Sequence, residues 1–253
     1  MKLNKVNTSN QNSALVSLIQ DSNQILPVDA NFFIAFDRSK LSSSLRPIDF
    51  ITFQKMWINP LLSTFPNLSI HESVYDEITV NYSAQKFIDK QIGKYQQPLL
   101  LSDSELDENG EIVRASIEKK IAKYTRYEPE KDNADNRGEV KSLAYIATKG
   151  LLYFCSHDSN ALKLIEKASE WDTNLESVNA IRTYEILYYL LKAKATSKDV
   201  VRFLYKYLYY STKSDKAVNP EWGIFINEMD NLYDELISTC PDFPDISAVQ
   251  VNP

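Results

Sequence analysis

The sequence is poor in the residues that mark several common classes of protein. Its two cysteines, Cys155 and Cys240, lie far apart and lack the spacing of a zinc site or a disulfide framework. Five glycines and ten prolines leave little room for low-complexity linkers. No run of eighteen apolar residues occurs, so a membrane-spanning helix is not expected. The net charge of −6 argues against a protein that holds nucleic acid by bulk electrostatics.

The composition is otherwise that of an ordinary globular protein. Hydrophobic residues make up 43% and charged residues 25% of the chain, which favours one domain with a full core. The first 23 residues are polar and lack the pattern of a secretion signal, so we expect a cytoplasmic protein. The predicted organisation is a polar N-terminal segment, one α/β domain, C-terminal helices packed on that domain and a tail, at residues 1–24, 25–180, 181–238 and 239–253.

Apolar runs of strand length alternate with helical patterns along the first 180 residues. This alternation predicts an α/β fold, a three-layer α/β/α sandwich with a mainly parallel central sheet and additional C-terminal helices. We also expect a helix-like run from Phe32 to Phe36, a bend or helix end at Pro60, and a helix cap at Ser73. The strands are predicted at Ile25–Val28, Leu68–Ile70, Pro98–Leu101, Leu151–Cys155 and Leu175–Val178, and the helices at 48–63, 71–78, 111–124, 138–149 and around Leu162 and Ile165.

Three further helices are predicted at 181–195, 198–210 and 222–237. Their apolar residues recur at steps of three and four, which indicates packing in a core. A second interpretation is a stacking and phosphate-contacting face for a single nucleic-acid strand. It would be formed by Tyr205, Tyr207, Tyr209 and Tyr210 with Arg202 and Lys206.

Four acidic residues occupy comparable places in the predicted fold. Asp29 and Asp158 each follow an apolar strand, Glu77 lies in the helix after the second strand, and Glu139 begins the helix before the fourth. Ligands of open parallel sheets sit beyond the carboxyl ends of the strands, so these acids are expected to converge. Converging carboxylates repel one another unless they are protonated or bind a cation, and hard oxygen ligands suit Mg²⁺ or Mn²⁺.

Other interpretations of these acids remain open. Each of the four also fits an ordinary helix cap or a solvated helix face. Glu72 or Asp76 are alternatives to Glu77 as the ligand from that helix, and Asp132 and Asp135 are secondary candidates in a charged loop.

The order of these motifs resembles the PIN-domain nuclease family. The resemblance is carried by Val28-Asp-Ala-Asn31, by Ile70 to Ile78, by Arg137-Gly-Glu-Val140 and by Ser156-His-Asp158. It implies that Asp29, Glu77, Glu139 and Asp158 are the catalytic, metal-binding acids of a metal-dependent nuclease, and that Asn31 is the polar residue accompanying the first acid. His157 and Lys141 are candidates for contacts with substrate phosphates.

The resemblance also implies a biological setting. The expected substrate is RNA, and the expected role lies in a toxin–antitoxin pair, a stress response or phage defence, with a protein antitoxin or a second copy of the chain as partner and no membrane. Two alternatives are a catalytically inactive binding or regulatory protein of the same fold and a structure-specific DNA nuclease.

Overall fold

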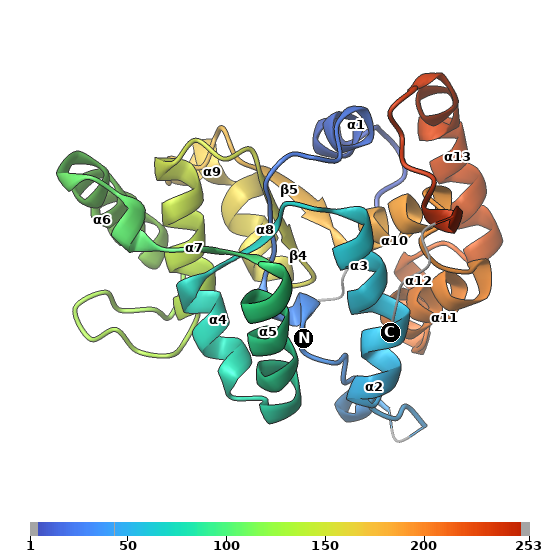
Figure 1. Ribbon diagram of the computed structural model, residues 1–253, viewed down its shortest axis with the longest axis horizontal. Helices are drawn as coiled ribbons and strands as arrows, with labels where there is room; N and C mark the ends of the chain where they lie inside the picture. Colours follow the sequence, from blue (N-terminus) through green and yellow to red (C-terminus); the bar gives the residue numbers. More distant parts are fainter. Residues whose placement is uncertain (1–4, 43, 249–253) are drawn as a thin grey trace. The chain divides into compact units, whose positions relative to one another are not determined.

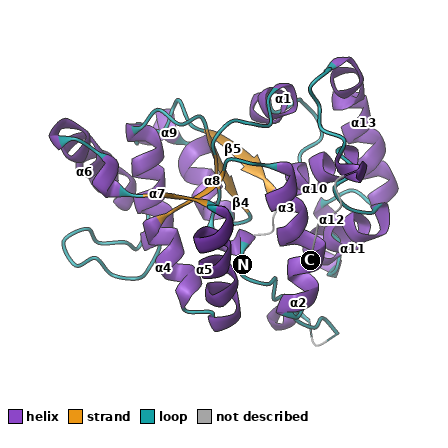
Figure 2. Ribbon diagram, viewed as in Figure 1, coloured by secondary structure: helices purple, strands orange, loops and turns teal. Residues whose placement is uncertain are grey.

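The computed structural model describes residues 5–42 and 44–248, which contain many helices and a few short strands (Figures 1 and 2). Two compact units are formed. One comprises residues 25–34 and 67–180, and the other comprises residues up to 24, 35–66 and 181 onward. Across the described residues, every helix is too short or too polar to cross a membrane.

The unit of residues 25–34 and 67–180 is built on parallel strands. β1 (Leu26–Pro27) pairs with β2 (Leu68–His71), and β2 pairs with β3 (Leu99–Leu101), both in parallel. β4 (Tyr153–Ser156) forms a second sheet with β5 (Asn179–Arg182), the strand through which the chain leaves this unit. A parallel bridge between Val28 and Cys155 joins β1 to β4. The strand connections therefore change direction between β1 and β4, where ligands of open α/β sheets bind.

Pro27 explains why only one bridge joins β1 to β4. The amides of Leu26 and Val28 point to the β2 side, where they donate to Asn67 and Ser69, and the amide of Asp29 points to the other side, where it donates to the Cys155 carbonyl at 3.0 Å. Pro27 lies between Leu26 and Val28, so its nitrogen points to the β4 side as that of Asp29 does. Proline has no N–H and therefore cannot donate a hydrogen bond to β4. The contact between the two strands is consequently confined to the end of β1, beside Asp29.

Helices separate the strands of this unit. α6 lies alongside α7, and α4 packs on α7, which brings the first turn of α7 beside α4 (Figure 1). The apolar core here lies among α6, α7, β4 and α8, with Phe154, Leu143 and Ile121 fully buried. The bounds are η1 (Ala30–Phe32), α4 (Glu72–Thr79), α5 (Tyr82–Tyr95), η4 (Asp103–Glu105), α6 (Glu108–Ala122), α7 (Arg137–Thr148), α8 (Ser159–Glu166) and α9 (Ala168–Trp171). Short parallel sheets with many helices are compatible with the predicted α/β class.

The other unit is largely helical. Its elements are α1 (Ser13–Gln20), η2 (Ser39–Leu41), α2 (Phe50–Phe53), the π-helical η3 (Gln54–Ile58), α3 (Asn59–Thr64), α10 (Thr183–Lys192), α11 (Lys198–Tyr209), α12 (Lys213–Val218), α13 (Trp222–Thr239) and η5 (Ile246–Ala248). Tyr205 of α11 stacks on Phe225 of α13 at 4.3 Å between ring centroids, and Tyr207 and Tyr209 are also buried. The core interpretation is therefore confirmed for Tyr205, Tyr207 and Tyr209, which cannot stack on a nucleic-acid strand, while Tyr210 is half-buried.

Several local predictions differ from the structure. The run from Phe32 to Phe36 is not helical, because the 3-10 turn η1 ends at Phe32, although Phe32, Phe33 and Phe36 are all buried. Pro60 does not end its helix: it follows the π-helical η3, and α3 continues to Thr64. His71, and not Ser73, caps α4, since its side chain accepts the Ser73 amide.

The remaining differences concern whole elements. The fifth strand begins at Asn179 and not at Leu175, because the apolar residues Leu175 and Val178 are buried in the core next to α6 and α7. The helices α1 and α5 were not predicted. α5 has a long polar face with only Ala84 and Ile88 buried, whereas α1 is short and lies in a segment that is otherwise polar.

Tyr205 provides a test of the core that the C-terminal helices form. We expect Tyr205→Ala to lower the free energy of unfolding by about 3–5 kcal/mol, as loss of a fully buried aromatic side chain does. The matched control is Phe203→Ala on the same helix, where 47% of the side chain is exposed and the loss should be far smaller. Chemical denaturation followed by circular dichroism measures both, and equal losses would contradict the core interpretation.

Candidate metal centre

Asp29 is held at the end of β1 by three hydrogen bonds. Its Oδ1 accepts the Ala30 amide at 2.7 Å, and its Oδ2 accepts Asn31 Nδ2 at 2.5 Å and Ser156 Oγ at 2.8 Å. Only 4% of the residue is exposed. Burial raises the pKa of Asp29 to about 7, with the hydrogen bond from Ser156 opposing it and the charges of Glu77 and Asp158 adding to it.

Ser156 connects Asp29 to Asp158. It is the last residue of β4, and its hydroxyl donates to Asp29 and accepts the Asp158 amide at 2.8 Å. Asp158 also caps α8, because its Oδ1 accepts the Asn160 amide at 2.6 Å. The capping interpretation of Asp158 thus holds together with its placement near Asp29. The role of Ser156 was not predicted, although a hydroxyl ending an apolar strand was a visible signal.

Glu139 lies in the first turn of α7 and is 8% exposed. Its Oε2 accepts Asn136 Nδ2 at 3.2 Å. Burial, together with the charges of Asp29, Asp158 and Glu77 in that order of strength, raises the pKa of Glu139 to about 9, and the hydrogen bond from Asn136 opposes this rise. Glu139 is therefore within electrostatic reach of the other three predicted acids.

Glu77 completes the group from α4. Its Oε1 accepts the Gly138 amide at 2.9 Å, one residue before Glu139. Burial raises the pKa of Glu77, while the Gly138 hydrogen bond and the charge of Arg137 lower it. The charges of the other three predicted acids thus act on Glu139, although among the described residues no three of these four acids have ligand oxygens within 4.8 Å of one another.

The chemistry of this group fits a divalent cation. All four donors are carboxylates, the oxygen ligands that Mg²⁺ and Mn²⁺ prefer. Burial and mutual repulsion disfavour the ionised forms of Asp29 and Glu139 at neutral pH, and a nearby cation would favour them. The residues that would hold it are Asp29, Glu77, Glu139 and Asp158.

Three further predicted site residues lie around this group. Asn31 donates to Asp29, and its Oδ1 accepts the backbone amide of His157 at 3.3 Å. Lys141 lies two residues after Glu139 in α7, and its Nζ forms an ion pair with Asp132 at 2.7 Å. Asn31 therefore orients the first acid, while Lys141 is bound to the charged loop.

The alternative acidic ligands have other partners. Glu72 accepts Ser102 Oγ at 2.5 Å, and Asp76 pairs with Arg137 at 2.8 Å. Asp132 accepts from Arg137, Lys141 and Tyr127, so it ties down the charged loop before α7. Asp135 is exposed.

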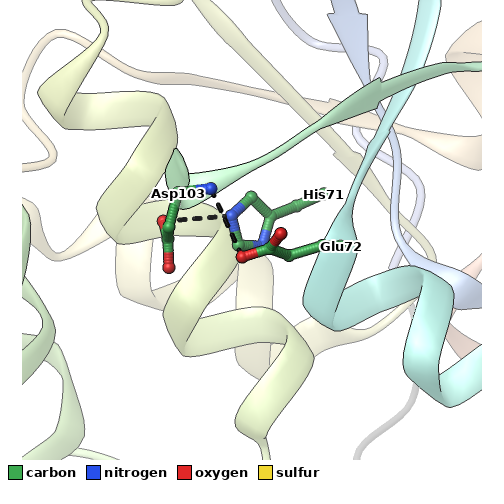
Figure 3. Close-up of side chains that lie close together, drawn as sticks. All are labelled: His71, Glu72 and Asp103. Carbon is green, nitrogen blue, oxygen red and sulfur yellow. Dashed lines mark hydrogen bonds and ion pairs between the residues drawn. The ribbon is translucent and has the colours of Figure 1, made fainter. Parts of the chain in front are cut away.

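A second group of possible ligands lies at the ends of β2 and β3. Ligand atoms of His71, Glu72 and Asp103 lie within 4.8 Å of one another (Figure 3). Among the described residues, no other set of three or more His, Cys, Asp or Glu side chains has ligand atoms this close together. However, Arg114 Nε lies 2.8 Å from Asp103 Oδ1, and His71 contacts both Ser73 Oγ at 2.8 Å and Asp103 at 3.3 Å. A guanidinium in contact with the carboxylate disfavours a cation there, and the hydrogen bonds account for the cluster as a structural network.

The raised pKa values have a consequence for stability. Asp29 and Glu139 bind protons more tightly in the folded chain, so without metal the free energy of unfolding falls as pH rises, from near their ordinary pKa values of 3.8 and 4.5 up to about 7 and about 9. In a chelator, we expect Glu139→Gln to melt at a higher temperature than the wild type at about pH 8, with the difference shrinking toward about pH 5.

The control for this comparison is Glu176→Gln, an exposed acid of the same unit, which should not change the melting temperature at either pH. Differential scanning fluorimetry across this pH range measures all three proteins. A Glu139→Gln variant that is less stable than the wild type at the higher pH would contradict the burial of a charge-disfavoured carboxylate.

Comparison with known proteins adds no family assignment. No family model, no curated protein and no solved structure matches the chain. The function is therefore inferred from the geometry of the site itself.

Proposed function

We propose that the protein is a metal-dependent nuclease that hydrolyses phosphodiester bonds, most specifically an endoribonuclease of the PIN type. The observation that carries the proposal is that Ser156 links Asp29 to Asp158 while Glu77 binds the residue next to Glu139, so that the charges of Asp29, Asp158 and Glu77 all act on the buried Glu139 carboxyl. The three-layer α/β/α sandwich and the PIN relationship belong to this proposal. They are supported by the change of direction of the strand connections between β1 and β4.

The chain's own residues have defined tasks in this proposal. Asp29, Glu77, Glu139 and Asp158 hold Mg²⁺ or Mn²⁺, and Asn31 and Ser156 orient Asp29 through their hydrogen bonds. A cation bound there supplies neutralisation of phosphate charge and activation of a water for in-line attack. His157, whose amide is bound by Asn31, lies next to Asp158 and contacts the substrate phosphate.

A local basic surface supports a nucleic-acid substrate despite the net charge of −6. Lys86, Lys90 and Lys94 follow one another at steps of four along α5 and are all exposed. In the part of the chain that the structure describes, they form no ion pair, whereas Lys119, Lys131 and Lys167 of the same unit pair with carboxylates. A row of unpaired cations on one helix face suits a phosphate backbone.

The resemblance to PIN nucleases extends the proposal to a biological role. The proposed role is that of a toxin paired with a protein antitoxin, or of an enzyme in a stress response or in phage defence. In each role, a partner would restrain the nuclease activity. The alternatives, an inactive binding protein and a structure-specific DNA nuclease, are separated from this proposal by the outcomes below.

The role of the acids in cleavage is tested by replacing a carboxylate with an amide of the same shape, which removes the negative charge. We expect Asp29→Asn and Asp158→Asn to lose RNA cleavage in Mn²⁺ while retaining the wild-type circular dichroism spectrum. Asp172→Asn is the control, because Asp172 is an exposed acid of the same unit. Parallel digestion of single-stranded RNA, single-stranded DNA and flap DNA identifies the substrate. Cleavage retained in the Asp29 variant would refute the assignment, and wild-type protein without metal binding or cleavage would favour the inactive binding protein.

The basic surface of α5 is tested by its salt dependence. Each contact to a single-strand phosphate contributes about 0.7 to the slope of log affinity against log salt, so replacing Lys86, Lys90 and Lys94 by Gln should reduce that slope by about 2. We expect KM for RNA to rise with kcat unchanged. The matched control replaces the ion-paired Lys119, Lys131 and Lys167 by Gln. An identical slope in both triple variants would remove α5 from the substrate surface.

A further inference from the structure

The first turn of α7 lacks a cap from its own chain segment. Asn136 occupies the N-cap position with a φ of 59°, in the left-handed region, and its side chain makes no capping hydrogen bond. The Asn136 amide group donates instead to Glu139, and its Oδ1 accepts the Arg126 amide at 3.3 Å. The leading N–H groups of a helix need acceptors from elsewhere when the N-cap supplies none.

Glu77 supplies such an acceptor from α4. Its Oε1 lies 2.9 Å from the Gly138 nitrogen, and a carboxylate at a helix N-terminus is also favoured by the helix dipole. Ser73, on the same helix as Glu77, donates to the Gly138 carbonyl at 3.4 Å. α4 therefore holds the Gly138 residue by both its N–H and its C=O.

Only glycine permits this approach. A Cβ built on Gly138 would lie 2.4 Å from Glu77 Oε1 and 2.6 Å from Glu77 Cδ, far inside van der Waals contact. The nearest atoms belong to the end of a flexible side chain, so a Cβ would displace the Glu77 carboxylate and leave the helix itself intact. Gly138 has no side chain that could bind a ligand, and its contribution at this position is the space that the Glu77 carboxylate occupies.

We propose that Gly138 is a positioning residue of the metal centre: the absence of its side chain lets Glu77 cap α7 from outside and fixes Glu77 beside Glu139. This inference rests on the proposed function, because it assumes that the two acids share a cation. One carboxylate oxygen of Glu77 accepts the Gly138 amide, and in this proposal the other oxygen binds the cation. The cap thus couples the placement of two acids that come from different helices.

The test is Gly138→Ala, with Gly93→Ala as the matched control. Gly93 lies inside α5, and a Cβ there meets nothing within 4 Å. Alanine is the better helix former at both positions, which offsets the loss of the Glu77 cap in Gly138→Ala, a loss of about 1 kcal/mol; in a chelator both variants should therefore melt close to the wild type. We expect Gly138→Ala to bind Mn²⁺ about tenfold more weakly or worse by calorimetric titration, as loss of an orienting contact does, and Gly93→Ala to bind it as the wild type does.

Two substitutions of Glu77 separate capping from charge. Glu77→Gln keeps an oxygen that can accept the Gly138 amide, whereas Glu77→Ala keeps none. Without metal, hydrogen exchange at the backbone amide of residue 138 should stay slow in the wild type and in Glu77→Gln. The same amide should exchange fast in Glu77→Ala and in Gly138→Ala. Adding Gly138→Ala to Glu77→Ala should weaken Mn²⁺ binding no further than Glu77→Ala alone.

The outcomes distinguish this inference from the function on which it rests. Wild-type protein that binds no Mn²⁺ would overturn the proposed metal centre, and slow exchange at Gly138 in Glu77→Ala would overturn the cap. If the wild type binds Mn²⁺ and Gly138→Ala binds it equally well, the positioning role alone is overturned.

Discussion

A single parallel bridge between Val28 and Cys155 is the contact on which the arrangement of the site depends. It joins the end of β1 to β4 beside Asp29, whose amide points to β4 where Pro27 has none to donate, and the Asp29 backbone and side chain then both bind β4. Because the bridge lies at the carboxyl ends of both strands, it delivers Asp29 and Asp158 to the same edge. The helices α4 and α7 bring the other two acids to that edge.

The group formed in this way is held together against its own repulsion. Burial raises the pKa of Asp29 to about 7 and that of Glu139 to about 9, so ionising both acids opposes folding. Hydrogen bonds from Ser156 and Asn31 to Asp29, and from Asn136 to Glu139, offset part of this cost. Sites that do chemistry commonly retain such unfavourable groups, because the ligand that they bind supplies the missing stabilisation.

The sequence was informative where the signal was local and uninformative where tertiary contacts decide. Asp29, Glu77, Glu139 and Asp158 could be proposed from the sequence because each stands at a fixed place relative to a strand or helix that its own neighbours predict. Ser156 and Gly138 were not assigned a role, since a hydroxyl and a missing side chain acquire meaning only when the facing residue is known. The fifth strand was misplaced for the same reason. Leu175 and Val178 are buried in the core cluster that contains residues of α6 and α7, and they do not belong to a strand.

The two clusters of possible ligands in this unit differ in what surrounds them. His71, Glu72 and Asp103 lie closer together, but Arg114 already neutralises Asp103, and the His71 ring is held by Ser73 and Asp103. In the four-acid group, the nearest guanidinium belongs to Arg137, which is bound to Asp76 and Asp132 and only lowers the pKa of Glu77. Proximity alone favours the first cluster, whereas uncompensated negative charge favours the second. Since a cation is attracted by charge that the protein leaves unbalanced, we propose the four acids, and not the more closely spaced cluster, as the metal site.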